Sequence, residues 1–370
     1  MNTFLDILDR LSRTILDTFK RFPLASLSAF LVSLILILFI EFESSSINKV
    51  YGLLGIKLAF VLSLGIFLFP VFHLLNRSIW FKLIGVALLG GYFYFLPLEI
   101  EPITVLRHIL LIFALSFMFF WAPFFNIDIS NKNIWEWTMK ILLVLLSTIL
   151  LTLTIYIVFY LLIYYLHKLF GVEILDKRYL EFIILVLGLF SVNFFLFHLP
   201  KYICLLQLKQ YTRVGEVFTK YILTPVTILY LLVLSAYILK ILVFGMWEEL
   251  LDIDWLVIGY SFFAIITYMF WTPLVDNFPD FFKELIWKPL LLLSFILAFS
   301  ILLRVADGVD LNSLYLLIVF DIWLGGISIY FLYIEKASYK WLFFSISLLI
   351  VLSQSEYVVD FLLKLVDTNF

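Results

Sequence analysis

One carboxylic acid lies in an unusual setting. Asp321 interrupts an apolar run, Leu316 to Trp323, about ten residues into a predicted helix over 312–334. If that helix crosses a membrane, a charge at its centre costs about 3 kcal/mol by insertion scales. Asp321 is therefore a candidate to carry a proton or to bind a cation. A structural hydrogen bond or ion pair across a helix bundle is the alternative.

Three other polar side chains lie within or at the ends of apolar runs. Lys240 lies about one turn from the outer end of its predicted helix, where it can extend its ammonium group to the interface; turned inward, it would face Asp321 or an anionic substrate. Asn193 is expected to make a helix–helix hydrogen bond. Arg304 is expected to anchor its helix at the interface. Asp321, Lys240 and Asn193 are the candidates for a substrate or ion pathway.

Glu41 and Glu43 form an acidic pair after the first apolar run. The pair resembles the one that lipid-linked-sugar transferases place in their first outer loop to hold a metal. Those enzymes usually have long outer loops, whereas this one has about a dozen residues. The pair is a weak metal candidate.

No other pattern indicates catalysis or a cofactor. The four histidines share no metal-ligand spacing on one helix, and Cys204 is the single cysteine. No glycine-rich phosphate loop, nucleophile elbow or zinc-protease spacing occurs. Apart from the weak candidate pair Glu41 and Glu43, we therefore predict no metal site, and we predict no cofactor and no catalytic residue. Enzymatic activity stays open, and its absence is the expectation.

The composition indicates which solvent these residues face. The chain of 370 residues is 64% hydrophobic and 14% charged, whereas a soluble domain is about half apolar and about a quarter charged. So much apolar surface must face lipid. The net charge of −2 gives no basic bias to attract nucleic acid.

A helix needs about 20 residues to cross the hydrocarbon core of a membrane. Eleven apolar runs of the sequence reach or approach this length. We therefore predict an all-α polytopic membrane bundle of about eleven helices. The runs are 22–40, 53–75, 80–98, 104–125, 138–166, 180–199, 218–244, 255–276, 285–303, 312–334 and 339–354.

The positions of Lys and Arg predict the orientation. With the N-terminus in the cytoplasm, 16 of them lie on the cytoplasmic side and 8 on the outer side, which favours N-in and C-out. The predicted segments are an amphipathic cytoplasmic helix (1–21), one transmembrane domain (22–354) with possible halves 22–199 and 218–354 around a basic loop (200–217), and an outer tail (355–370).

Two stretches are similar enough to suggest an internal repeat. Phe119 to Pro123 and Met269 to Pro273 both end a predicted helix with Trp-x-Pro. Leu98 to Glu101 and Leu251 to Asp254 precede these helices as matching acidic loops. Some transporters contain such parallel repeats. Trp at interfaces and Pro after helices are also common without duplication.

Pro225 is the best candidate for a helix kink, because proline removes a backbone donor inside a helix. It lies a third of the way into the predicted helix 218–244. Gly pairs inside other helices permit close helix packing.

Two longer stretches carry a family resemblance. The helix from Phe218 to Leu242 opens with Phe-Thr-Lys-Tyr-Ile-Leu-Thr-Pro and continues to Ala-Tyr-Ile-Leu-Lys. From Arg304 to Trp341 there follow an Arg, an Asn and a Tyr, and a Trp-Leu-x-Gly helix. This resembles the bacterial membrane family called domain of unknown function 4153. The matching residues are Tyr221, Pro225, Tyr230, Tyr237, Lys240, Arg304, Asn312, Tyr315 and Trp323.

The resemblance spans about residues 30 to 355 and departs from the family at two places. The basic residue between the family's Asn and Tyr is missing after Asn312, and no Trp-Pro follows the first stretch. The resemblance implies a multi-pass bacterial membrane protein and implies no activity.

These observations lead to three hypotheses about function. The first is transport or permeation of a small solute or lipid-like molecule in a bacterial cytoplasmic membrane, with Asp321 in the pathway. The second is a non-catalytic scaffold or sensor that acts through a membrane-protein partner or a second copy of the chain. The third is a lipid-linked substrate transferase, which requires Glu41 and Glu43. All three have the bilayer as their surroundings, and none involves nucleic acid.

Overall fold

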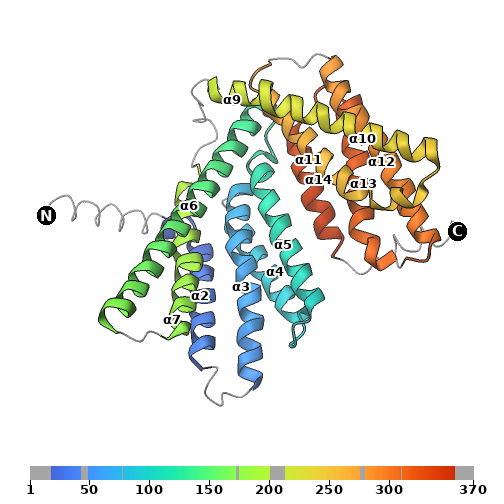
Figure 1. Cartoon of the computed structure of the whole chain (residues 1–370). Helices are drawn as coiled ribbons and strands as arrows, with labels where there is room; N and C mark the ends of the chain where they lie inside the picture. The colour runs from blue at the N-terminus through green and yellow to red at the C-terminus, as the bar shows by residue number, and fades with distance from the viewer. Residues whose placement is uncertain are drawn as a thin grey trace. The chain divides into compact units, whose positions relative to one another are not determined.

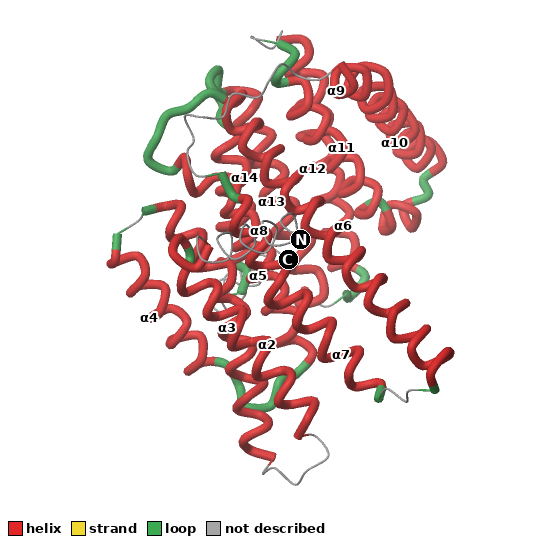
Figure 2. The backbone as a smooth tube through the Cα atoms, turned by 90° about the vertical axis from the view of Figure 1, so that its left-hand side faces the viewer, coloured by secondary structure: helices red, strands yellow, loops and turns green. Residues whose placement is uncertain are grey.

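The computed structural model describes residues 18–42, 49–76, 78–171, 175–200, 213–275, 280–309 and 311–354. Every regular element in these ranges is helical, and Figure 2 shows no strand among them. The predicted amphipathic segment 1–21 lies outside the described residues except for 18–21. The predicted outer tail, 355–370, lies wholly outside the described residues, and so does most of the predicted loop 200–217.

The prediction of an all-α polytopic membrane protein is confirmed. In the described part of the chain, nine helices are long and apolar enough to cross a membrane, and Ile79–Phe95 and Tyr339–Leu352 are shorter apolar helices. Each of the eleven predicted runs falls on one of these segments. How many segments cross and which side each end faces stay predictions.

The chain divides into two compact units. Unit 1 comprises Met1–Ile127 and Trp137–Ile203, and unit 2 comprises Asp128–Glu136 and Cys204–Phe370. The described helices that lie in unit 1, wholly or for most of their length, are α2 (Pro23–Phe42), α3 (Lys49–Leu75), α4 (Ile79–Phe95), α5 (Pro102–Trp121), η1 (Ala122–Phe124), α6 (Asn131–Phe170), α7 (Asp176–Ile184), η2 (Leu185–Ser191) and α8 (Val192–His198).

In unit 1, α3 packs against α2, α4 and α5 (Figure 1). Leucine and valine side chains of α3, among them Leu64 and Leu68, join Leu89 of α4 and Leu115 of α5 in a buried cluster. The outer faces of these helices are apolar too, as expected of helices whose surroundings are lipid.

Unit 2 holds the remaining described helices: α9 (Arg213–Phe218), η4 (Thr219–Leu223), α10 (Thr224–Phe244), η5 (Trp247–Asp252), α11 (Asp254–Trp271), α12 (Asp280–Ala306), α13 (Leu311–Tyr333) and α14 (Tyr339–Leu352). Successive helices from α10 to α14 pack against one another, and α12 and α13 are the most closely paired. A buried aromatic group lies where the ends of α11 and α13 meet the starts of α12 and α14: Tyr268, Trp287, Phe331 and Tyr339 are in ring contact.

The helix α6 is much longer than a membrane is thick. Its 40 residues rise about 60 Å, whereas the hydrocarbon core is about 30 Å thick. It must therefore tilt strongly or extend beyond the lipid, as the length of its apolar run predicts.

Two segments depart from α-helical geometry inside predicted spans. Leu185–Ser191 and Thr219–Leu223 are π-helices. The apolar run 180–199 is therefore one span built of α7, η2 and α8 rather than a continuous α-helix. A π-helix in the middle of an α-helix is often found at functional sites.

The two stretches of the suggested repeat are alike in burial and differ in contacts. Trp137 and Trp287, which follow the two Trp-x-Pro motifs, are 1% and 0% exposed. The indole N–H of Trp137 donates to the carbonyl of Phe119 at 2.9 Å, whereas Trp287 stacks on Phe331. The helices that follow the two copies also differ in their partners. In the second copy α12 packs closely on the next helix, α13, whereas after the first copy α7 and η2 pack on α2. The repeat stays a prediction.

Candidate functional site

Asp321 lies in the middle of α13, opposite the middle of α12. Ser294 is buried and lies near the middle of α12, as Asp321 does in α13. Its hydroxyl interacts with the Asp321 carboxyl group. One turn later on α13, Gly325 faces the same Ser294: a Cβ atom there would lie 2.8 Å from Ser294 Oγ. The missing side chain lets the two helices approach at the level of the carboxyl group.

The carboxyl group of Asp321 is incompletely partnered. Its Oδ1 atom is buried and has no hydrogen-bond partner among the described residues. The ion pairs within the described part of the chain do not include Asp321 either. A buried, unpaired polar atom is costly, so this one marks a place where a proton, a cation or water could bind.

The other two pathway candidates make their own contacts. Lys240 is exposed on α10, with Nζ 6.0 Å from the ring centre of Tyr237. No ion pair between Lys240 and Asp321 occurs among the described side chains. Asn193 belongs to unit 1, where its Oδ1 accepts a 2.7 Å hydrogen bond from Ser26 of α2. The predicted helix–helix hydrogen bond of Asn193 is confirmed.

Pro225 stands directly after the π-helix Thr219–Leu223, in the first turn of α10. Proline lacks the N–H that would bond to the carbonyl four residues earlier, and its ring crowds that carbonyl. Just before it, the Thr224 hydroxyl donates to the carbonyl of Thr219, five residues earlier, at 2.8 Å. The predicted interruption of the helix at Pro225 is thus a local switch from π- to α-helix.

The other residues that match the family pattern mainly make structural contacts. The Tyr230 hydroxyl donates to the Leu256 carbonyl at 3.0 Å, and the Trp323 indole donates to Ser345 at 3.0 Å. Arg304 forms a 3.1 Å ion pair with Asp254. Of the remaining matches, Tyr221 is exposed, Tyr315 is partly buried, and the side chain of Asn312 lies outside the described residues.

Glu41 is held by cations of the chain itself. Its Oε2 accepts a 2.6 Å bond from Lys177, and its Oε1 accepts one from Arg178, which also bonds Glu181 at 2.7 Å. Both carboxylate oxygens are thus occupied, and the described residues contain no group of three possible metal ligands. Glu43 lies outside the described residues. This arrangement gives the transferase hypothesis no support.

A buried histidine that the sequence did not single out joins three helices. His108 of α5 is 6% exposed. Its Nε2 is 2.8 Å from Ser63 Oγ of α3, and its Nδ1 is 3.0 Å from the Tyr92 hydroxyl of α4. Both ring nitrogens are therefore satisfied, as a structural polar contact inside a helix bundle requires.

We expect the substitution His108→Phe to destabilise the protein by about 1–2 kcal/mol, because it keeps an aromatic ring but removes interhelical hydrogen bonds. The measurement is unfolding of the purified protein in mixed micelles with increasing sodium dodecyl sulfate. Tyr92→Phe and the double variant complete a cycle. If the two single effects add fully, the His108–Tyr92 hydrogen bond contributes nothing.

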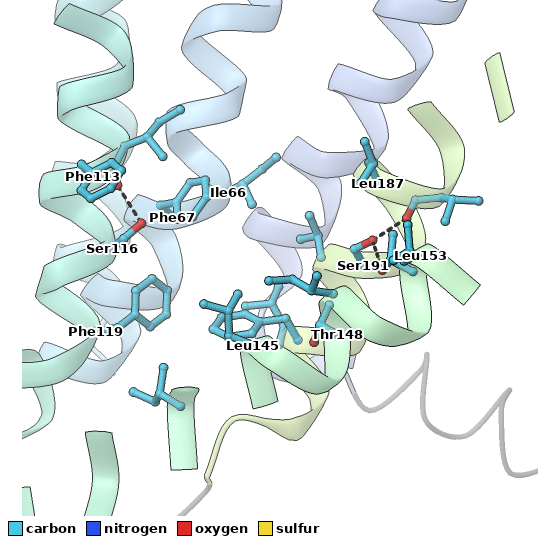
Figure 3. Close-up of a pocket in the computed structure, with 18 of the residues that line it drawn as sticks. Ile66, Phe67, Phe113, Ser116, Phe119, Leu145, Thr148, Leu153, Leu187 and Ser191 are labelled. Atoms are coloured by element: carbon cyan, nitrogen blue, oxygen red, sulfur yellow. Dashed lines mark hydrogen bonds between the residues drawn. The ribbon is translucent and has the colours of Figure 1, made fainter. Parts of the chain in front are cut away.

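An apolar cavity of about 690 Å³ lies within unit 1. Its walls come from α3, from α5 and from the stretch of α6 between Ile141 and Tyr156, and they are completed by the end of α7, by η2 and by α8. Figure 3 shows Phe113, Ser116 and Phe119 on one side and the labelled residues of α6 and η2 on the other. Neither Asp321 nor Lys240 nor Asn193 lines it.

Comparison with models of known families, with curated proteins and with solved structures gives no match. Its described helices, nine of which are long and apolar enough to cross a membrane, define the chain as an all-α, multi-pass membrane protein. Its resemblance to the family called domain of unknown function 4153 stays a prediction.

Proposed function

We propose that this protein transports a small solute or a lipid-like molecule, or lets it permeate, across a bacterial cytoplasmic membrane, with Asp321 as a proton- or cation-binding group. The observation that carries the proposal is the buried Oδ1 atom of Asp321 on α13, which has no hydrogen-bond partner among the described residues. A carboxyl group at membrane depth costs free energy, so its presence there calls for a role. Gaining and losing a proton, or holding a cation, is the role its chemistry permits.

Two features support a working carboxyl group over a purely structural one. Asp254, the other buried aspartate of this unit with one unpartnered oxygen, has a cation partner in Arg304, whereas Asp321 has no ion pair among the described residues. Ser294 supplies a hydroxyl that can donate to a carboxylate or accept from a carboxylic acid, so it accommodates both protonation states.

The test is a flux measurement with the purified protein in liposomes. A pH-sensitive dye inside the vesicles reports proton entry driven by a potassium diffusion potential, and a sodium-sensitive dye reports sodium entry. We expect wild-type protein to carry one of these ions and Asp321→Asn to reduce that flux by about tenfold or more, since the amide can neither release a proton nor pair with a cation.

Asp307→Asn is the matched control, because Asp307 is an exposed aspartate just after the end of α12 in the same unit. It should leave both the flux and the amount of protein in the membrane unchanged. Equal flux in wild type and Asp321→Asn, or no flux of either ion through wild-type protein, contradicts the proposal.

A further inference from the structure

We propose that the cavity in unit 1 is a binding site for the hydrocarbon chain of a membrane lipid. This site is separate from Asp321, which does not line it. It could serve a lipid-like transported molecule or a lipid that stays bound, and the proposal requires only that one chain occupies the cavity.

The first argument is the polarity of the walls. Most of the lining side chains are Ile, Leu, Val and Phe, and no charged residue is among them. Ser116 donates its hydroxyl proton to the Ile112 carbonyl, and Thr148 donates to Val144. A polar solute would therefore leave water without replacement hydrogen bonds, at a cost of several kcal/mol, whereas a hydrocarbon chain loses nothing.

The hydroxyl groups of Thr152 and Ser191, which also line the cavity, are satisfied by each other and by the backbone. Ser191 donates to the Val186 carbonyl at 2.7 Å, and Thr152 lies 2.8 Å from Ser191 Oγ. Tyr156, which has the fifth lining hydroxyl, is the last lining residue along α6. The polar atoms of the cavity are thus either internally bonded or at its end.

The second argument is shape. The lining residues of α6 run from Ile141 to Tyr156, a rise of about 22 Å. This exceeds half the thickness of a hydrocarbon core of about 30 Å. The volume of about 690 Å³ lies within the range of about 300–1,000 Å³ that is usual for ligand sites. A long, apolar space of this kind fits an extended chain better than a compact molecule.

The third argument is access. Ile149, Leu153 and Leu187 line the cavity and are 54%, 52% and 52% exposed. The cavity is therefore not sealed. Because these residues lie on helices that are long and apolar enough to cross a membrane, the molecules expected to reach them are lipids, whose chains are already free of water.

The wall formed by η2 is built in an uncommon way. Its Gly188 packs against α2, where a Cβ atom would overlap Ser33 Oγ, while Val186, Leu187 and Ser191 of the same π-helix line the cavity. The π-helix thus brings α2 close on one side and supplies apolar side chains to the cavity on the other. Such segments are frequent at functional sites.

The experiment uses the full-length protein in phosphatidylcholine nanodiscs and octadecanoic acid that carries a photoreactive diazirine in mid-chain. After illumination, mass spectrometry maps the labelled residues. We expect labelling to concentrate in 112–120, 141–156 and 183–196, the stretches that line the cavity. Unlabelled octadecanoic acid should compete, and butanoic acid should not.

A pair of neighbouring substitutions separates the cavity from the general lipid surface. Ile149 lines the cavity and Leu150 does not, yet they are 54% and 55% exposed. Ile149→Trp should fill part of the cavity and reduce labelling about tenfold, which corresponds to about 1.4 kcal/mol, whereas Leu150→Trp should leave it unchanged. Ser116→Phe, on the opposite wall, should act like Ile149→Trp if the latter fails to fold.

Two further variants test the stated chemistry. Thr152→Val should label like wild type, because the proposal uses no polar contact in the centre of the cavity. Asp321→Asn should also label normally, so failure of the proposed ion flux and failure of this site are distinguishable. Uniform labelling of all the apolar helices, or equal loss in Ile149→Trp and Leu150→Trp, would overturn the proposal.

Discussion

Replacing Trp287 by alanine is expected to lower the free energy of unfolding by about 4 kcal/mol, the middle of the range for removing a large aromatic side chain from a core. Trp287 is 0% exposed within the buried aromatic group of unit 2. Its ring stacks on Phe331 with centroids 4.3 Å apart and meets the edge of Tyr268 at 5.3 Å. Alanine leaves a cavity that these neighbours cannot fill without losing their own contacts.

The control is Trp255→Ala in the same unit. Trp255 lies near the start of α11 and is 75% exposed, so its removal opens no cavity. Both variants are compared with wild type by titration with sodium dodecyl sulfate in mixed micelles, followed by far-ultraviolet circular dichroism. Similar losses for the two tryptophans would mean that the aromatic group of unit 2 is not its stabilising core.

The helices could be predicted from the sequence because lipid imposes a simple rule. Every backbone N–H and C=O in the hydrocarbon must be bonded within its own segment, so each long apolar run becomes a helix. The run 138–166, for example, lies wholly within α6. The same rule does not distinguish an α-turn from a π-turn, since both satisfy the backbone. The π-helix Leu185–Ser191 therefore leaves no compositional signal.

Single residues could be identified where the signal is local. Asp321 is conspicuous because a charge interrupts an apolar helix, and Pro225 because it lacks a donor. By contrast, His108 meets Ser63 and Tyr92 only after α3, α4 and α5 have packed. Nothing in the separation of these three positions along the chain indicates that they meet.

The cavity could not be predicted, for a related reason. It depends on how the side chains of six helical segments fail to fill the space between them. Its lining residues, such as Ile149, are no different in type from Leu150, which does not line the cavity. A sequence pattern describes what each helix presents, whereas a cavity is a property of the packed set.

Arg304 illustrates the same limit, because sequence reasoning assigned it to the interface and the structure pairs it with Asp254. The guanidinium nitrogen is 3.1 Å from Asp254 Oδ2, and the two side chains are only 18% and 12% exposed. Asp254 Oδ1 is buried without a partner among the described residues. The guanidinium group is therefore the main compensation for a carboxylate that α11 holds out of water.

Replacing Arg304 by methionine should therefore cost about 3 kcal/mol, the lower end of the range for removing one partner of a buried ion pair. Adding Asp254→Asn should restore part of the loss, because the neutral amide leaves no buried carboxylate without a cation. Lys288→Met is the control on the same helix: its pair with Glu284 is 61% and 50% exposed and should contribute about 0–1 kcal/mol. Detergent unfolding of wild type, Arg304→Met, Asp254→Asn and the double variant measures the coupling, with Lys288→Met beside them. If Arg304→Met costs no more than Lys288→Met, the pair with Asp254 does not stabilise unit 2.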